Sequence, residues 1–287
     1  MNLSNALSQE SQFISLEFFP PKERSNWDSF YAEVERLQAL KPLFCSVTYG
    51  AGGSTQANTL DICKGIKDKF GLETMSHFTG VGADDSDIFE YLESMRQAGM
   101  TNILALRGDA PMNVDPAKLK IRYASELVTL VKEQFPEFSV GVAGYPEAHP
   151  DSVSIKDDLD FMKKKVECGA DFVTTQLFFE NRVYFDYVDR LKDMGVACPV
   201  LPGIMPITSL SSLKRLLSLC DARIPGKLYN QFESAHNEGG TPAVREVGIA
   251  HAAAQVKGLL EGGAPGVHLY TLNKADACLE ICRRVGI

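Results

Sequence analysis

Eight short apolar segments, each followed by a stretch with helical spacing, constrain the fold of this chain more than any other sequence feature. Several of the segments are nearly continuous in apolar residues, which is typical of parallel strands covered on both faces. Eight strands alternating with helices predict a (β/α)8 TIM barrel of the α/β class rather than an open doubly wound sheet. The predicted strands are residues 13–19, 44–50, 73–80, 102–108, 139–145, 172–179, 198–205 and 266–272.

The stretches between these segments have the spacing of amphipathic helices. In residues 25–40, Trp27, Phe30 and Leu37 fall near one helical face. Residues 84–99 open with several possible cap residues and end in glycine, as the start and stop of a helix should. The helices therefore follow the strands in the order that a barrel requires.

The interval between the seventh and eighth predicted strands is long, at about 60 residues. We expect extra helices there, including residues 224–234 and 242–262. The chain shows no low-complexity tract, linker or break in composition, so residues 1–287 are predicted to form one catalytic domain.

The composition excludes several classes of protein. A net charge of −8 argues against a nucleic-acid backbone as the main partner. No stretch has the roughly 20 apolar residues of a membrane span, and the first dozen residues lack the pattern of a signal peptide. Seven cysteines without a C-x-x-C pair suit reduced thiols, so we expect a cytoplasmic protein. Cys278 and Cys282 lie one helical turn apart, but a metal site there is disfavoured.

Function in such barrels gathers at the carboxyl ends of the strands, which raises the interest of Glu17 in the first strand. A carboxyl group between Leu16 and Phe18 should be partly desolvated, and desolvation should raise its pKa, as general-acid work near neutral pH requires. The alternative is a structural ion pair inside the barrel.

The fourth predicted strand ends in Arg107, Gly108 and Asp109. A guanidinium group there suits a phosphate or another anion, and glycine permits close approach of the backbone. The aspartate could accept hydrogen bonds from a heterocycle. Two alternatives are that the opposite charges satisfy each other in a surface turn, or that the triplet is an adhesion motif, which would need an extracellular protein.

Other polar groups lie near the ends of the predicted strands. The glycine-rich residues 50–55 could approach a phosphate, although an ordinary loop is the simpler interpretation. The lysine run 163–165 is either a solvated helix face or a site for a diphosphate. Single residues with hydrogen-bonding side chains at strand ends are Thr48, Tyr49, His77, Tyr145, His149 and Gln176.

This set is rich in hydrogen-bonding groups and poor in nucleophiles. No serine-nucleophile motif, H-E-x-x-H sequence or zinc cluster is found in the sequence. The combination favours a bound redox cofactor with one acid over covalent hydrolysis.

Eight strings in order, spread over residues 14 to 273, resemble the bacterial methylenetetrahydrofolate reductases. They are SLEFFPPK, SVTYGAGGST, HFTG, ALRGD, GYPEAHP, TQLFF, LPGIMP and YTLN. The resemblance implies a (β/α)8 barrel that holds FAD non-covalently at the strand ends. It implies that NADH or NADPH reduces the flavin, after which 5,10-methylenetetrahydrofolate takes the same place, opens to an iminium ion and receives hydride to give 5-methyltetrahydrofolate.

The resemblance also assigns residues. It makes Glu17 the general acid that protonates the folate nitrogen, and it places Asp109 near flavin and pterin, where its charge would stabilise the cationic iminium. The positions implied for folate are Asp109, Gln176, Tyr270 and Lys274. The positions implied for FAD are Thr48, His77, Leu106, Arg107, Gly108, Asp109, Tyr123, Ala124, Tyr145, His149, Asp158, Lys164 and Lys165, with the lysines facing phosphate.

The sequence departs from the enterobacterial pattern in five places, which are Phe161 for asparagine, Lys164 and Lys274 for arginine, Ser212 for glutamine and Leu216 for phenylalanine. A lysine cannot reproduce the bidentate fork of an arginine, so the departures bear on the electron donor and on FAD retention. Two alternatives follow: a relative that takes electrons through a partner subunit or works without flavin, and a non-redox barrel that only binds or transfers folate one-carbon groups. A homo-oligomer is a further possible assembly. Without the additional C-terminal domain of the eukaryotic relatives, feedback control through such a domain is not expected.

Overall fold

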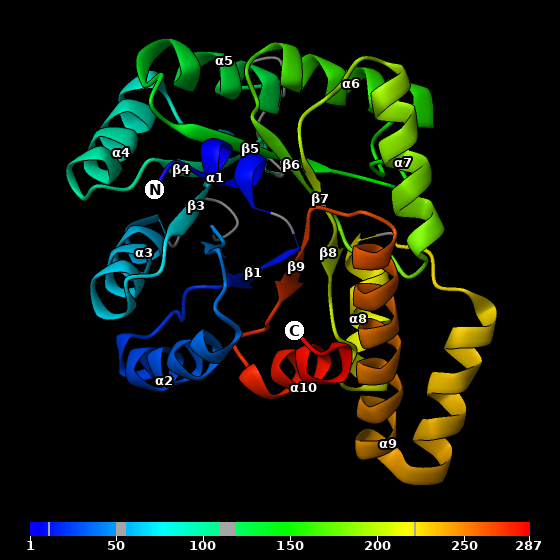
Figure 1. The fold of residues 1–287 in the computed structure, drawn as a ribbon. Helices are drawn as coiled ribbons and strands as arrows, with labels where there is room; N and C mark the ends of the chain where they lie inside the picture. Colours follow the sequence, from blue (N-terminus) through cyan, green and yellow to red (C-terminus); the bar gives the residue numbers. More distant parts are fainter. Residues whose placement is uncertain (11, 50–55, 109–118, 221) are drawn as a thin grey trace.

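The computed structural model describes residues 1–10, 12–49, 56–108, 119–220 and 222–287, and within them the expected barrel is confirmed (Figure 1). Parallel strands pair in the order β7-β6-β5-β4-β3-β2-β1-β9-β8. The strands are β1 (Phe13–Phe18), β2 (Phe44–Val47), β3 (Thr74–Thr79), β4 (Asn102–Leu106), β5 (Ser139–Gly144), β6 (Phe172–Thr175), β7 (Val200–Leu201), β8 (Gly203–Ile204) and β9 (Gly266–Tyr270).

Helices surround the sheet, one after almost every strand (Figure 1). They are α1 (Leu3–Gln9), α2 (Trp27–Leu37), α3 (Gln56–Phe70), α4 (Asp85–Gln97), α5 (Ala124–Gln134), α6 (Ile155–Glu167), α7 (Asn181–Asp193), α8 (Leu210–Cys220), α9 (Gly226–Glu261) and α10 (Ala275–Val285), with 3-10 turns at Arg24–Asn26 and Gln38–Leu40. No helix in the described ranges is long and apolar enough to cross a membrane.

The seventh predicted strand is divided at Pro202 into β7 and β8. The first half pairs with β6 and the second half pairs with β9, so the strand bridges the two ends of the sheet. A proline has no N–H group to donate to a ladder, but its carbonyl oxygen accepts a hydrogen bond of 2.9 Å from the backbone of His268. The chain therefore closes the barrel at this point.

Alternate residues of the strands fill the barrel interior. Near the amino ends of the strands, an apolar layer contains Phe13, Phe44, Met75, Leu104, Phe172 and Leu201, packed against Leu3 and Leu7 of α1. The outward residues, such as Ile14, Leu16 and Phe18, pack under the helices. Polar side chains, among them Ser15 and His268, replace the apolar ones nearer the carboxyl ends of the strands.

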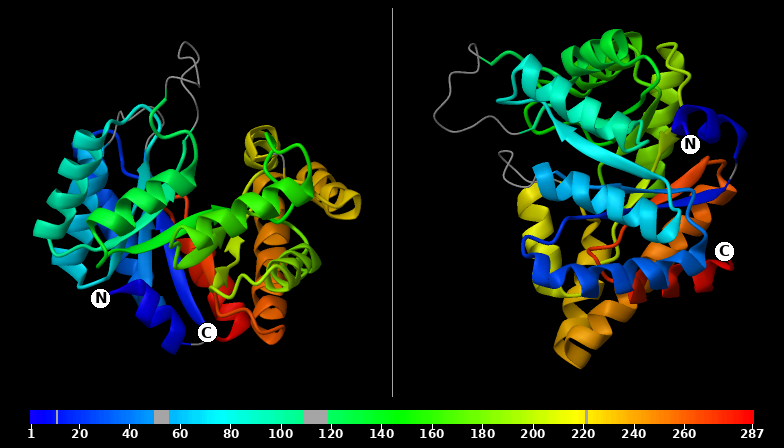
Figure 2. Two further views of the ribbon diagram at one scale, coloured as in Figure 1. Left: turned by 90° about the horizontal axis from the view of Figure 1, so that it is seen from above. Right: turned by 90° about the vertical axis from the view of Figure 1, so that its left-hand side faces the viewer.

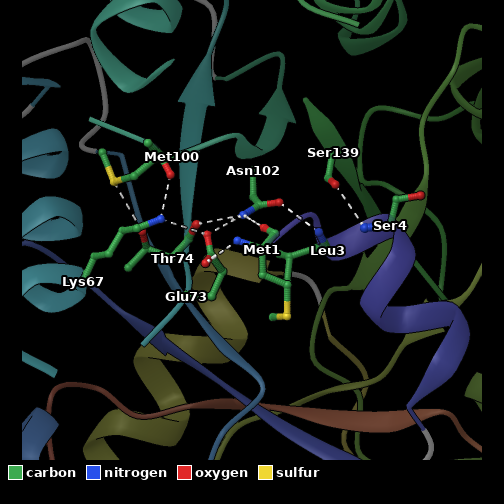
Figure 3. A network of polar contacts seen from close by, with 10 residues as sticks. Met1, Leu3, Ser4, Lys67, Glu73, Thr74, Met100, Asn102 and Ser139 are labelled. Atoms are coloured by element: carbon green, nitrogen blue, oxygen red, sulfur yellow. Dashed lines mark hydrogen bonds and ion pairs between the residues drawn. The ribbon is translucent and has the colours of Figure 1, made fainter. Parts of the chain in front are cut away.

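Helix α1, which the sequence analysis did not predict, lies across the amino end of the barrel (Figures 1 and 2). Asn102 at the start of β4 holds it there. The side-chain oxygen of Asn102 accepts a hydrogen bond of 3.0 Å from the backbone of Leu3. The side-chain amide nitrogen of Asn102 donates to Met1 O and to Glu73 Oε1, each at 3.0 Å. Ser4 donates to Ser139 Oγ at 3.0 Å in the same network (Figure 3).

The Asn102→Ala variant should lose about 2 kcal/mol of unfolding free energy, because it leaves the buried N–H of Leu3 and the carboxylate of Glu73 without this partner. Denaturant titration followed by circular dichroism measures the change. Asn58→Ala is the matched control, since Asn58 makes an exposed hydrogen bond of 3.4 Å to Lys22 O and should cost under about 0.5 kcal/mol. Equal losses in the two variants would contradict the role given to Asn102.

The long interval before β9 contains α8 and α9, as expected. Helix α9 is broken at Gly240, where φ is 62° and ψ is −152°, so it forms a helical hairpin beside the barrel (Figures 1 and 2). Pro242 follows the break, in agreement with its place near the start of a new helix. The second arm packs along β8 and β9 through buried residues that include Ile249 and Val256.

Candidate functional site

Glu17 lies at the carboxyl end of β1, with its side chain directed into the barrel. Three side chains from three other strands surround its Oε2 atom. His77 Nε2 on β3 is 3.2 Å away, Ser46 Oγ on β2 donates a hydrogen bond of 3.2 Å, and His268 Nε2 on β9 is 3.4 Å away. The carboxyl group is 16% exposed, so these neighbours replace most of its contact with water.

The direction of the Glu17 pKa shift differs from the expectation. Burial raises the pKa, as predicted, but the opposing charges of His77 and His268 and their hydrogen bonds lower it more, to about 2. The predicted net rise was wrong, because the sequence did not show that two imidazoles from distant strands would lie beside this carboxylate. In this arrangement Glu17 is ionised at neutral pH.

His268 is a site residue that the sequence analysis missed. It is completely buried, its Nδ1 shares a hydrogen bond of 2.8 Å with Ser15 Oγ, and its ring stacks on Phe44 at 6.0 Å between ring centroids. A signal was present, because His268 and Tyr270 alternate with Val267 and Leu269 in the eighth predicted strand. Two-residue periodicity places them on the same inward face.

The YTLN segment holds the end of β1 in place. Thr271 donates two hydrogen bonds to the carbonyl oxygen of Glu17, from its hydroxyl at 2.6 Å and its backbone at 3.1 Å. Asn273 makes reciprocal hydrogen bonds with the backbone of Phe19, at 3.0 and 2.8 Å. Leu272 and Asn273 have positive φ angles of 51° and 56°, which are uncommon for residues with a side chain. The hydrogen bonds of Thr271 and Asn273 to Glu17 and Phe19 maintain this conformation.

Arg107 does not point freely into solvent. Its Nε donates to the carbonyl oxygen of Gly108 at 3.0 Å, and its NH2 group is 3.2 Å from Asp151 Oδ2. Gly108 has φ +82°, and a Cβ atom there would lie 2.0 Å from Thr79 Cγ2, so glycine is required for both reasons.

Asp109 and the glycine-rich residues 50–55 lie outside the described residues.

Three of the positions implied for FAD form one cluster after β5. Tyr145 and His149 meet edge to face at 4.6 Å, and the backbone of His149 donates to Asp158 Oδ1 at 3.2 Å. Lys165 donates to the carbonyl oxygen of Ala143 at 2.8 Å, and burial lowers its pKa to about 8 against the opposing charge of Asp158. Lys164, by contrast, is exposed. Of the two lysines expected to face phosphate, one is therefore already bonded to the backbone.

Tyr123 and Phe161 form an exposed aromatic pair between α5 and α6. Their rings stack at 5.8 Å with an interplanar angle of 19°, and the two residues are 40% and 45% exposed. The guanidinium group of Arg122 lies 5.7 Å from the centre of the Tyr123 ring. Large exposed aromatic surfaces next to cations are typical of ligand sites rather than of a solvated helix face.

The remaining predicted residues lie around the same end of the barrel. The Tyr270 hydroxyl donates to Thr175 O at 2.7 Å, and burial together with Glu17 raises its pKa. Gln176 Oε1 accepts from the backbone of Leu177 at 2.9 Å, while Lys274 is exposed at the start of α10. Thr48, Leu106 and Ala124 occupy the ends of β2 and β4 and the start of α5.

A metal centre is not supported by the described part of the chain. No group of three or more His, Cys, Asp or Glu side chains there could hold a metal ion, and Cys278 and Cys282 are free thiols on the buried face of α10. What the arrangement offers is one carboxylate able to exchange a proton with adjacent imidazoles, surrounded by hydrogen-bonding groups from neighbouring strands.

Comparisons with known proteins agree with this description. A family model described as methylenetetrahydrofolate reductase matches residues 2–286. The 5,10-methylenetetrahydrofolate reductase of Escherichia coli K12 is 36% identical over 287 residues, covering 100% of this chain and 95% of that protein. Methylenetetrahydrofolate reductase (NADH) 1 of Arabidopsis thaliana is 34% identical over 99% of this chain, and the chain spans 50% of that relative's length.

Solved structures support the fold. An uncharacterized protein from Clostridium thermocellum that binds two copies of 5-methyl-5,6,7,8-tetrahydrofolic acid aligns over 100% of this chain and 98% of its own, with a TM-score of 0.68 and 14% identity. A dihydropteroate synthase from Coxiella burnetii, in complex with pteroic acid, covers 96% of this chain and 92% of its own, with a TM-score of 0.53 and 14% identity.

Proposed function

This chain belongs to the methylenetetrahydrofolate reductase family, and we propose that it reduces 5,10-methylenetetrahydrofolate to 5-methyltetrahydrofolate with electrons from NADH or NADPH. The observation that carries the proposal is the buried Glu17 carboxylate, held within 3.4 Å of two imidazoles and a serine at the carboxyl end of the barrel. Ring opening of a methylene-bridged amine needs a proton donor, and a carboxylate in contact with two imidazoles can exchange a proton at this end of the barrel.

FAD is the redox group proposed for this site, and the residues fit it. His77, one of the positions proposed for FAD, lies buried at the carboxyl end of β3 with its Nε2 3.2 Å from Glu17 Oε2. Gly108 allows close approach of a cofactor to the backbone, and the exposed Tyr123–Phe161 pair offers an aromatic surface for a heterocycle. Lys164 is the exposed cation of the FAD set, suited to phosphate.

In the proposed reaction, bound FAD carries hydride from the nicotinamide to the folate. The role of the protein is to protonate a folate nitrogen while the bond between that nitrogen and the methylene carbon breaks. The electron pair of the bond stays on the nitrogen, and the carbon becomes part of an iminium ion. Glu17 supplies that proton. Gln176 and Tyr270 are proposed to contact the pterin from β6 and β9, Lys274 to contact the folate, and Asp109 to stabilise the cation.

Two features favour a second candidate, a folate-binding barrel of the same family that takes electrons through a partner subunit or works without flavin. Lys165 is bonded to Ala143 O, and Phe161 stands where the enterobacterial pattern has an asparagine near the adenosine end of FAD. The hydrogen bond of Lys165 and the substitution at Phe161 each reduce the number of polar groups available to the cofactor. A homo-oligomer and a cytoplasmic location, which suits the free cysteines, are part of the main proposal.

The visible spectrum of the purified protein, reconstituted with FAD, tests the function. Anaerobic NADH or NADPH should bleach the flavin, and methylenetetrahydrofolate should restore its absorbance while 5-methyltetrahydrofolate forms. Flavin that neither nicotinamide reduces would point to the partner subunit. No flavin after reconstitution would overturn the FAD assignment, and reduced flavin that folate cannot oxidise would overturn the proposed reaction.

A further inference from the structure

The most fully enclosed titratable side chain near Glu17 is His268. Both of its ring nitrogens meet polar atoms: Nδ1 is 2.8 Å from Ser15 Oγ, and Nε2 is 3.4 Å from both Glu17 Oε2 and Ser46 Oγ. The residue is 0% exposed, and the Phe44 ring lies almost parallel to it, at 20°. The ring therefore cannot turn without breaking contacts on two sides.

When Ser46 donates to Glu17, a proton must lie between His268 Nε2 and Glu17 Oε2. If Ser15 donates to Nδ1, then Nε2 carries the hydrogen and donates to the carboxylate. If Ser15 donates instead to the carbonyl oxygen of Val267, at 3.4 Å, then Nδ1 carries a hydrogen, and the second proton lies either on Nε2 or on Glu17. Two lone pairs facing each other in a buried site would repel, so each arrangement in which Ser46 donates to Glu17 places one proton on this line. The proton can be released as an acid when Nδ1 also carries a hydrogen, because His268 is then an imidazolium.

We infer that His268, anchored by Ser15, is a positioning residue that orients the Glu17 carboxyl group and stores the proton that Glu17 delivers. The inference rests on the proposed function and accounts for a difficulty in it. A carboxyl group with a pKa of about 2 is almost always ionised at neutral pH and is a poor acid by itself. An adjacent imidazolium solves this, because the pair keeps one exchangeable proton at a pH at which an isolated carboxyl group would have none.

The proton balance is simple. As the carbon–nitrogen bond of the substrate breaks, its electron pair stays on the nitrogen, which takes a proton from Glu17. Glu17 receives that proton from His268 Nε2 and passes it on, so the pair changes from an imidazolium and a carboxylate to a neutral imidazole and a carboxylate. Water returns one proton to the pair before the next turnover. No oxidant or reductant is needed for this step.

Two other titratable side chains face the same carboxylate. His77 on β3 has its Nε2 3.2 Å from Oε2, and the residue is proposed to contact FAD. Tyr270 on β9 has its hydroxyl proton committed to Thr175 O. His268 is distinguished from both by its hydrogen-bonded anchor, and it has no assigned role in binding either ligand.

The test follows the folate half-reaction of the reduced holoenzyme by rapid mixing across a range of pH. In His268→Gln, the amide retains a donor toward Glu17 but cannot hold an exchangeable proton. The alkaline limb of the rate profile should move to lower pH, since a carboxyl group loses its proton at lower pH than an imidazolium. At the alkaline end the rate should fall by about 10- to 100-fold, and at the acid end by less than about threefold.

His251→Gln is the matched control, because His251 is a half-buried histidine of α9 that packs against Phe179. It should leave the profile unchanged.

Ser15→Ala removes the hydrogen bond to His268 Nδ1 and keeps the imidazole. It should move the alkaline limb of the rate profile in the same direction by a smaller amount, and it replaces His268→Gln if that variant fails to fold. A loss that is equal at every pH, or no loss in either variant, would overturn the inference. A wild-type protein that does not reduce folate would instead overturn the proposed function.

Discussion

Glu17→Gln is expected to slow the reduction of methylenetetrahydrofolate by about a thousandfold while flavin reduction by NADH stays within about threefold. Glutamine has nearly the same shape and can still accept the hydrogen bond from Ser46, but it has no proton to give to the folate nitrogen. Nicotinamide oxidation needs no such proton. Stopped-flow absorbance of the flavin separates the two half-reactions, each begun from protein in the appropriate redox state.

The same variant has a predicted effect on stability. The pKa of Glu17 is depressed from 4.5 to about 2, so its ionised form stabilises the folded protein above about pH 4.5, and this contribution is lost as pH falls toward 2. Glu17→Gln should therefore be less stable than the parent near neutral pH, and the difference should shrink in acid. If both half-reactions survived the substitution, the general-acid role would be wrong, whatever the stability showed.

Gly248→Ala is expected to lower the unfolding free energy by about 3–4 kcal/mol, although helix propensity alone favours alanine by about 1 kcal/mol. Gly248 lies in the second arm of α9, and a Cβ atom there would stand 1.8 Å from the carbonyl oxygen of Ile207. A backbone atom cannot swing aside as a flexible side chain can. The arm of the hairpin must move away from the segment that follows β8. Thermal unfolding should show a Tm lower by about 5–10 °C.

Gly226→Ala provides the comparison, because this glycine begins the same helix and a Cβ atom there would meet nothing within 4 Å. Its effect should stay within about 0.5 kcal/mol. A Gly248→Ala protein as stable as the Gly226→Ala protein would show that the hairpin packs more loosely on the barrel than its contacts indicate.

The barrel could be predicted because each strand carries its own signal. A parallel strand covered on both faces is apolar along its length, and the helix that follows it has its own period, so each unit is recognisable without its neighbours. The division of the seventh strand was not predicted, although Pro202 indicates in retrospect where one ladder must end. Helix α1 was missed because its role depends on Asn102, which is about 100 residues away in the chain.

The site could be predicted less completely, and for a physical reason. Glu17 was identified from its place in an apolar strand, yet the sign of its pKa shift depends on His77 and His268, which the fold brings from 60 and 251 residues away. Burial could be read locally, but the compensating charges could not. Asp109 stays a prediction, since it lies outside the described residues.

The hydrogen bonds from Thr271 to the carbonyl oxygen of Glu17 have a consequence for the synthesis of the protein. The proposed acid, Glu17, belongs to the first strand, but Thr271, which fixes its backbone, and His268, which is proposed to hold its proton, belong to the last segment of the barrel. A ribosome synthesises the chain from its amino end, so Glu17 leaves it more than 250 residues before its partners exist. Every shorter nascent chain has the carboxyl group without the imidazole of His268. The proposed folate chemistry at Glu17 therefore requires the final strand.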